Sequence, residues 1–250
     1  MKTRIAALLV LFVTAAFTAE TRDPAAVAVA RRTLEAMGGE HAFATLRTLK
    51  FDFVVERDGK EVARIHHVWD RWDGRYRLEG VNRDGKNFRT LFNVQQQGAG
   101  RSWLDGKELD GEALKKALER AYGRFINDTY WLLMPAKMQD PGVNLQSEGD
   151  SEKDGKTYDV VRLTFSDGVG LTPKDTYWAY VSKDSGLMER WEFVLTDQKA
   201  EDREAFLWTD WQTVLGVRLA MAKSAAAGGT VIRFDHVSGS DSSDDSAFTP

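Results

Sequence analysis

The stretch that decides the fold lies in the middle of the chain and reads Asn127-Asp128-Thr129-Tyr130-Trp131-Leu132-Leu133-Met134-Pro135. A helical pattern precedes it and strand patterns lie on both sides of it. We interpret the stretch as a hinge between two halves of one sheet, following a lid-like helix. Its large side chains would anchor that helix to the concave face of the sheet, and Pro135 would end the anchor. The anchoring residues we expect are Tyr130, Trp131, Leu133 and Met134.

The segment directly before this stretch, Gly111 to Arg124, has the periodicity of an amphipathic helix. Lys115, Lys116, Glu119 and Arg120 occupy the polar face. Its broad apolar stripe consists of Ala113, Leu114, Ala117, Leu118, Ala121, Tyr122 and Phe125. We expect this helix to lie over the sheet. A second helix is predicted from Ala25 to Met37, with Asp23 as N-cap, Pro24 at the first turn and Gly38-Gly39 as terminator.

Strand patterns fill most of the remaining chain. From Leu49 to Glu56 apolar and polar residues alternate, and tight turns such as Asp58-Gly59 and Asp84-Gly85 follow the strands. Connections this short require antiparallel neighbours. A sheet of about a dozen strands is expected to curl. The predicted fold class is therefore α+β and mostly antiparallel β, a strongly curved unclosed β-barrel of about 11–13 strands with helices covering or plugging its concave face.

The N-terminus has the order of an export signal. Lys2 and Arg4 precede an apolar run from Ile5 to Phe17, and small residues follow. Cleavage after Ala16 or after Ala19 stays open, and we take 1–19 as the signal peptide. Residues 20–238 form one domain in this interpretation, and the Ser/Asp-rich segment 239–250 is a disordered tail. The chain has no cysteine, which excludes a lipid-anchor cysteine, disulfides and thiolate zinc sites.

These features predict an exported protein, soluble in the periplasm or secreted, and monomeric. The formal net charge is −4, and removal of Lys2 and Arg4 with the signal changes it to −6. Nucleic-acid binding requires clustered basic residues, which this chain lacks. No second long apolar run follows the signal, so we expect no membrane-spanning segment in the mature protein.

No pattern for catalysis, a metal or a cofactor stands out. His66 and His67 are adjacent in a strand and therefore point to opposite faces, which prevents joint chelation. Asp128 is interpreted as local turn chemistry rather than as a catalytic acid. Ser166-Asp167-Gly168 lacks the frame of a nucleophile elbow, and Gly168-Val169-Gly170 lacks the third glycine of a dinucleotide loop. We assign no catalytic residue, no metal ligand and no cofactor.

The large aromatic side chains indicate a binding site more strongly than these polar motifs do, because the chain holds 8 tryptophans and its aromatic content is 11%. In a tightly closed sheet they would form the core, and in an open barrel some would line an apolar cavity. Our candidates for ligand contact are Trp69, Tyr76, Phe92, Trp131, Met134, Tyr177, Trp191 and Trp208.

Several motifs together resemble a known family. They are the first helix ending in Gly38-Gly39, the His-Val-Trp-Asp run of 67–70, the stretch 127–135 and Asp140-Pro141-Gly142-Val143. In combination they resemble a family of uncharacterised secreted bacterial proteins, which is itself similar to the periplasmic lipoprotein carriers and outer-membrane lipoprotein-sorting (LolA-like) proteins. The resemblance implies an unclosed barrel plugged by helices, with an apolar cavity for acyl chains.

Three functional hypotheses follow. The first is a non-enzymatic periplasmic binding or carrier protein for a lipid, a lipidated protein or another apolar ligand held in the concave face. In it, the helix from Gly111 to Arg124 or the loop from Asp167 to Asp175 gates the ligand. The second is a hydrolase that uses the same cavity. The third is a structural envelope protein whose core is filled by its own side chains.

Overall fold

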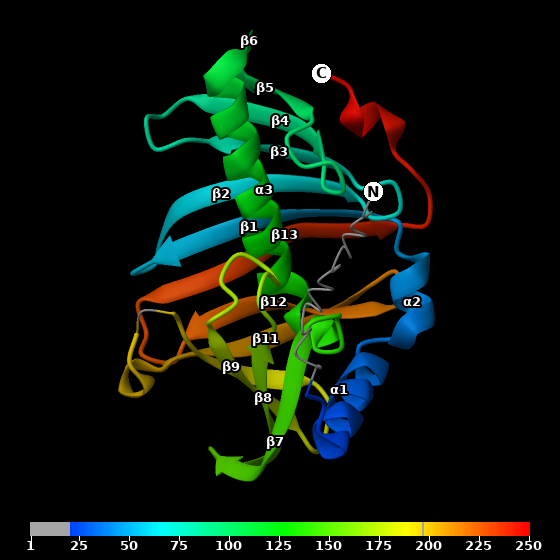
Figure 1. The fold of residues 1–250 in the computed structure, drawn as a ribbon, viewed down its shortest axis with the longest axis vertical. Coiled ribbons are helices and arrows are strands. Elements are labelled where there is room, and N and C mark those ends of the chain that lie inside the picture. Colours follow the sequence, from blue (N-terminus) through cyan, green and yellow to red (C-terminus); the bar gives the residue numbers. More distant parts are fainter. Residues whose placement is uncertain (1–20, 197) are drawn as a thin grey trace, which may run out of the picture.

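The strands of this protein form one antiparallel sheet, because short turns join nearly all of them. The computed structural model describes residues 21–196 and 198–250 (Figure 1). The predicted signal peptide 1–19 lies outside these residues. The strands are β1 (Thr48–Arg57), β2 (Lys60–Asp70), β3 (Arg75–Val81), β4 (Asn87–Asn93), β5 (Gly100–Leu104), β6 (Lys107–Glu108), β7 (Val143–Lys153), β8 (Lys156–Phe165), β9 (Thr176–Ser182), β10 (Met188–Val194), β11 (Glu204–Val214), β12 (Val217–Ala225) and β13 (Thr230–Ser240).

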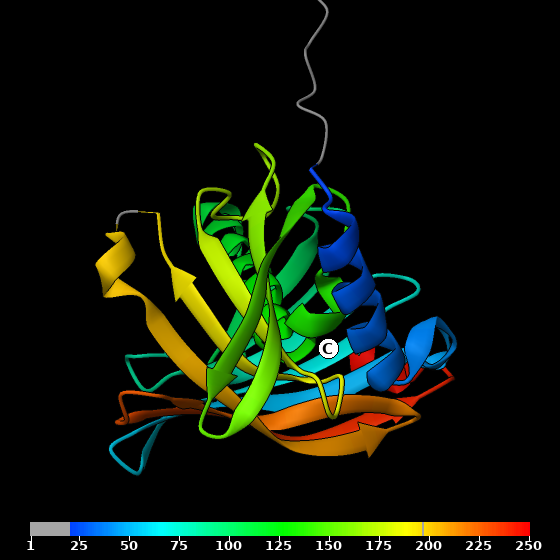
Figure 2. The same ribbon diagram turned by 90° about the horizontal axis from the view of Figure 1, so that it is seen from below.

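The strand order explains the overall shape. The 13-stranded sheet runs β6-β5-β4-β3-β2-β1-β13-β12-β11-β10-β9-β8-β7. The first and last strands of the chain, β1 and β13, pair in its centre, whereas β6 and β7 form the two free edges. The sheet curves strongly without closing into a barrel, and helices lie in its concave side (Figure 2). The predicted half-barrel is confirmed.

Three α-helices and three short 3₁₀ turns complete the described part. They are α1 (Pro24–Ala36), α2 (Gly39–Thr45), α3 (Gly111–Leu133), η1 (Met134–Lys137), η2 (Ala200–Asp202) and η3 (Asp245–Phe248).

Asp23 caps α1 as predicted, since its carboxylate accepts from the Ala25 N–H at 2.9 Å. Gly38 follows α1 with φ 117°, and a Cβ there would lie 2.2 Å from the Gly216 carbonyl oxygen. Glycine is therefore required at this close approach.

Helix α3 links the two free edges of the sheet. It begins after β6, crosses the concave face and leads through η1 to β7 (Figure 1). Its 23 residues span about 35 Å. No helix in the described ranges is long and apolar enough to cross a bilayer.

The predicted hinge at 127–135 requires correction. Residues 127–133 continue α3, and Met134 and Pro135 open η1. The helix therefore runs past Arg124, because Thr129, Leu132 and Leu133 keep its buried face toward the sheet. The two halves of the sheet meet at β1 and β13 instead. The anchoring role of the stretch holds, since Leu133 and Met134 are buried in the core.

The core has two parts, one under each half of α3. A large cluster beneath the C-terminal half includes Leu132 and Leu133 together with side chains of β1 and of β7 to β13. A smaller cluster beneath the N-terminal half contains Ile65, Tyr76, Leu78, Phe92, Leu118 and Ala121. The Trp69 side chain packs against both clusters. Burial of apolar surface on both sides therefore holds α3 in the concave face.

A buried polar chain connects α3 to the sheet between these clusters. The Asp128 carboxylate on α3 lies 3.2 Å from Nε2 of His67 on β2, and both side chains are fully buried. The other ring nitrogen of His67, Nδ1, is hydrogen-bonded to the Tyr76 hydroxyl at 2.7 Å. Asn127 donates to Asp128 at 2.7 Å, and Arg124 lies 3.6 Å from the same carboxylate. The interpretation of Asp128 as a turn residue is therefore wrong. Its carboxylate instead fixes α3 over β2.

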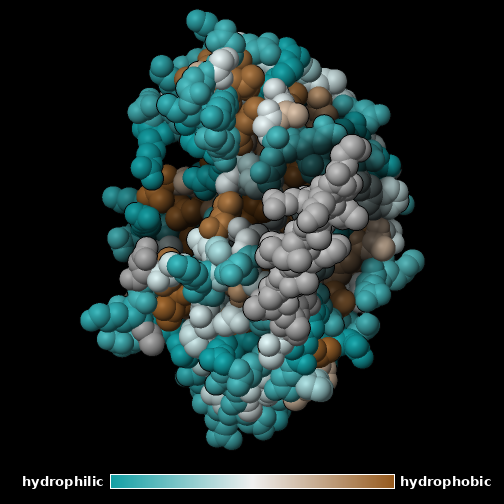
Figure 3. Space-filling view, in the orientation of Figure 1, coloured by the Kyte–Doolittle hydropathy of each residue, from teal (hydrophilic) through white to brown (hydrophobic). Residues whose placement is uncertain are grey.

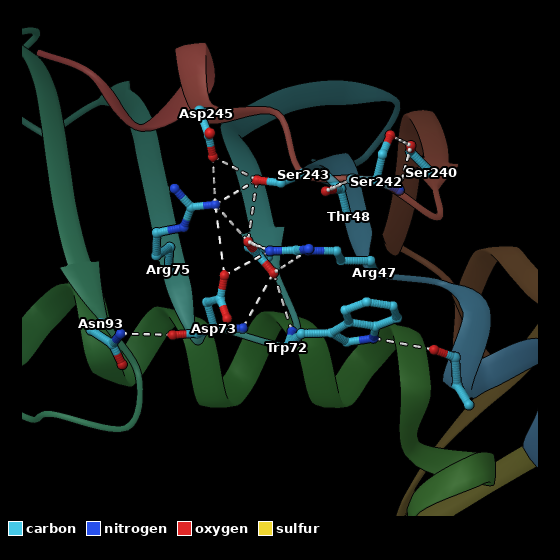
Figure 4. A network of polar contacts seen from close by, with 12 residues as sticks. Arg47, Thr48, Trp72, Asp73, Arg75, Asn93, Ser240, Ser242, Ser243 and Asp245 are labelled. Carbon is cyan, nitrogen blue, oxygen red and sulfur yellow. Dashed lines mark hydrogen bonds and ion pairs between the residues drawn. The ribbon is translucent and has the colours of Figure 1, made fainter.

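The segment 239–250 is ordered, so the predicted disordered tail is wrong. Strand β13 continues to Ser240, and the following residues cross the convex face of the sheet (Figure 4). Asp244 pairs with Lys50 at 2.6 Å, and Asp245 pairs with Arg75 at 2.8 Å. Composition alone predicts disorder, but these long-range ion pairs and hydrogen bonds hold the segment in place.

Removal of the Asp128 carboxylate should destabilise the protein strongly. Asp128→Ala leaves Nε2 of the buried His67 without its partner, and a buried polar group that loses its partner costs about 1–3 kcal/mol. Urea unfolding followed by tryptophan fluorescence measures this difference. Asp84→Ala, in an exposed turn, is the matched control and should change stability by less than about 0.5 kcal/mol. Equal stability of the two variants would contradict the proposed fixation of α3.

Stability should also depend on pH through His67. Burial lowers the pKa of His67, and the nearby Asp128 carboxylate opposes this only in part. Below about pH 6.5 the unfolded chain therefore binds more protons than the folded protein. The free energy of unfolding falls by up to about 1.4 kcal/mol per pH unit between pH 6.5 and the lowered pKa of His67. His67→Phe keeps the stacking on Phe51, whose ring centroid lies 4.4 Å away, and should remove the part of the slope that comes from His67.

Unfolding free energies between pH 7.5 and 5.0 test this prediction. His41→Gln, at an exposed position of α2, should retain the slope of the wild type. Identical pH profiles for the wild type and His67→Phe would show that His67 does not titrate on unfolding.

Candidate functional site

A cleft of about 920 Å³ lies beside the N-terminal part of α3. Three elements form its walls: α3, the β4–β5 loop and the β8–β9 loop. Apolar surface gathers in hollows on this side of the molecule, bordered by hydrophilic atoms (Figure 3). The lining residues are Gln97, Gly98, Gly111, Leu114, Lys115, Leu118, Glu119, Tyr122, Ile126, Gly168, Gly170 and Leu171. A volume of this size matches that of small-molecule sites in proteins.

The helical wall of the cleft is apolar because of its spacing. Leu114, Leu118, Tyr122 and Ile126 follow one another at intervals of four residues, which places them along one side of α3. Lys115 and Glu119 add one charge of each sign to the lining. The sequence predicted the first three of the apolar residues as part of the stripe that faces the sheet. In the structure, residues of this stripe pack in the small core cluster and also line the cleft.

The β8–β9 loop forms the opposite wall and is anchored at its base. The buried Asp175 carboxylate accepts from the Thr196 N–H and hydroxyl, both at 2.9 Å, and from the Tyr177 hydroxyl at 3.1 Å. Burial and the neighbouring Asp175 carboxylate raise the pKa of Tyr177, so its hydroxyl keeps its proton as a donor. The loop carries Leu171, whose side chain is 58% exposed. A fixed base and an exposed apolar residue suit a loop that covers a ligand.

A second, smaller cleft of about 500 Å³ lies along β3, β4 and β5. Its lining includes Glu79 and Arg89, which pair with each other at 2.6 Å, together with Trp103 and Pro250. Because these charges are already paired and belong to its walls, the second cleft is less suited to an apolar chain than the first.

The eight residues predicted to contact a ligand lie in the core. Tyr76, Met134 and Trp208 are fully buried or nearly so, Phe92, Tyr177 and Trp191 are buried, and Trp69 and Trp131 are half-buried. Several of them contact one another: the Trp131 ring lies 4.6 Å from Trp191, and the Trp191 ring lies 6.1 Å from Trp208. None of the eight lines either cleft. Their contact with a ligand stays a prediction that requires α3 to move.

Sequence reasoning missed one residue of the concave face. Lys223 on β12 is fully buried, and its Nζ lies 4.6 Å from the ring centroid of Trp208 and 4.0 Å from that of Phe234. A signal for it was present, because the buried residues Val217, Leu219 and Met221 alternate along β12 and Lys223 takes the next inward position.

Comparison with known proteins gives similarity at the level of structure. No family model matches the sequence, and no curated protein matches it either. A crystal structure of a LolA superfamily protein from Nitrosomonas europaea is similar with a TM-score of 0.52 and 11% identity, covering 90% of this chain and 97% of that one. A DUF1329 family protein from Desulfovibrio piger is similar with a TM-score of 0.49 and 13% identity, covering 90% and 97%.

An identity this low shows the fold alone. The half-barrel, its single sheet and the helices in its concave side agree with the resemblance predicted from the sequence motifs. The chain therefore has a LolA-like fold.

Proposed function

We propose that this protein is a non-enzymatic binding or carrier protein of the periplasm, or a secreted one, for a lipid, a lipidated protein or another apolar ligand. The observation that carries the proposal is the cleft of about 920 Å³ between α3 and the β8–β9 loop. The ligand enters through this cleft and reaches the concave face when α3 moves. The export pattern at the N-terminus and the LolA-like fold both support this assignment.

Burial of an acyl chain supplies the binding energy in this mechanism. Each buried methylene contributes about 0.8 kcal/mol. Association itself costs about 4–15 kcal/mol, so one chain gives reversible rather than permanent binding. The cleft lining offers apolar area from Leu114, Leu118, Tyr122, Ile126 and Leu171 for this burial.

The two parts of α3 are held to the sheet to different degrees, and this difference allows α3 to gate the ligand. The C-terminal part is fixed by Leu132, Leu133 and the Asp128–His67 contact, all of which are buried. The N-terminal part contacts the smaller cluster and borders the cleft. Movement of this part, together with the β8–β9 loop, opens the concave face without nucleotide hydrolysis.

A specific observation favours the structural alternative, in which the core is filled by the protein itself. The aromatic side chains of the concave face pack against each other and against α3, for example Trp131 against Trp191 and Phe206 with ring centroids 4.6 and 4.9 Å apart. The hydrolase alternative has less support, because the cleft lining contains no histidine and no hydroxyl nucleophile paired with a base.

Purification from a bacterial periplasm separates the carrier from the self-filled protein. We expect native mass spectrometry to show a mass above that of the mature chain, and organic extraction to release lipid in near-stoichiometric amount. Saturable uptake of a fluorescent fatty acid should follow delipidation. A protein that is isolated empty and takes up no fatty acid would support the self-filled core instead.

Polar substitution at the cleft should weaken uptake without loss of stability. Leu171→Asn removes an exposed apolar wall residue, so we expect about a tenfold weaker fatty-acid affinity and an unchanged melting temperature. Leu207→Asn is the matched control, since Leu207 is 36% exposed on β11 and does not line the cleft. Fluorescence titration of both variants tests this, and equal affinities would remove the cleft from the binding path.

A further inference from the structure

Lys223 is the exception in an otherwise apolar inward row of the sheet. In the strand pairing it lies between Trp208 on β11 and Ile232 on β13. Both neighbours are buried in the large core cluster, as is Met221 two positions earlier on β12. The lysine side chain therefore points into the concave side with apolar residues around it.

The ammonium group of Lys223 is poorly satisfied there. It can donate three hydrogen bonds. In the described part of the chain it donates to the Ala220 carbonyl oxygen, and no carboxylate lies within ion-pair distance. The faces of Trp208 and Phe234 provide a cation–π environment. Two N–H groups are thus left without an acceptor.

Several other buried charges of the described residues are paired with an opposite charge. Asp70 pairs with Arg47 and Arg75, and Glu192 pairs with Arg190 and Arg203. The Asp52 carboxylate accepts from Arg64 and from two histidines. Lys223 differs from these residues, because its partner in the described part of the chain is one carbonyl oxygen and no carboxylate.

An unpaired amine in this place lowers stability. Burial lowers the pKa of Lys223, because no charge compensates the loss of water around the amine. A methionine of similar length would fill the same space without this cost. The position therefore has the character of a functional rather than a stabilising residue.

We propose that Lys223 binds the carboxylate of a single-chain amphiphile such as a fatty acid, which enters the concave face when α3 moves; this assignment rests on the proposed function. Helix α3 crosses in front of the strands around β12 (Figure 1). The rings of Trp131, Trp191 and Trp208 pack one against the next between α3 and Lys223. The carboxylate supplies the missing acceptors, and the acyl chain follows along the apolar rings.

A matched pair of ligands tests the assignment. Dodecanoic acid and 1-dodecanol share the chain and differ in the charge of the headgroup at pH 7.5. For the wild type we expect the acid to bind at least tenfold more tightly, which corresponds to about 1.4 kcal/mol. Lys223→Met should bind both ligands with equal affinity and keep the affinity of the wild type for the alcohol. Lys153→Met removes a half-buried lysine of β7 that lies over the Tyr180 ring of β9, and this variant should keep the preference for the acid.

The outcomes separate the two proposals. If the wild type binds the alcohol as tightly as the acid, or if Lys223→Met keeps the preference for the acid, the role of Lys223 is overturned and the carrier function stands. Loss of the preference in Lys115→Met alone would place the headgroup at the cleft instead and also overturn it. If the wild type binds neither ligand, both proposals fail.

Photo-crosslinking of the wild-type protein provides a measurement that needs no folded variant. A fatty acid with a diazirine beside its carboxylate should label the peptides that contain Lys223, Trp208 or Phe234, as identified by mass spectrometry. Labelling confined to α3 and the β8–β9 loop would overturn the assignment, because the headgroup would then stay in the cleft.

Discussion

The connection between two edge strands constrains this whole structure. Strands β6 and β7 are separated by α3 in the chain, yet they lie at opposite edges of the sheet. The chain must therefore cross the full width of the sheet once, and it crosses on the concave side as a helix of 23 residues. A helix satisfies its own backbone hydrogen bonds during this crossing, which an extended loop could not do while buried. The concave face consequently contains a helix, whatever else it binds.

Much of this architecture could be predicted from local patterns. The alternation from Leu49 to Glu56, the Asp-Gly turns and the cap at Asp23 act over a few residues, and the structure confirms the strands, turns and helix start that they indicate. The hydrophobic stripe of α3 was predicted on the same basis. Its C-terminal end was not, because Asn127-Asp128 is typical of turns in isolation. The carboxylate of Asp128 finds its partner His67 on a distant strand, which no local pattern encodes.

One further error has the same origin in long-range contacts. The segment 239–250 has the composition of a disordered tail, but Lys50 and Arg75 on the convex face bind its carboxylates. The aromatic candidates on the strands, such as Tyr76 and Trp191, lie at inward positions in the two core clusters. Whether such residues line a cavity or fill a core depends on how closely α3 approaches, and that distance follows from the packing of the whole sheet. Lys223 shows the opposite case, since its inward position was predictable from the alternation along β12.

The two ends of α3 differ in the way they are held, and this difference links fold to function. At the C-terminal end, Leu132, Met134 and Met138 are completely buried, and Pro135 continues the chain into η1. At the N-terminal end, Leu114 and Tyr122 are only partly buried. Displacement of the N-terminal half exposes less apolar area than displacement of the other half, so it costs less free energy. In the proposed carrier function, α3 would therefore open around its C-terminal end. Such opening would uncover the apolar floor of the half-barrel while the sheet and the contact of Met134 with the core stay intact.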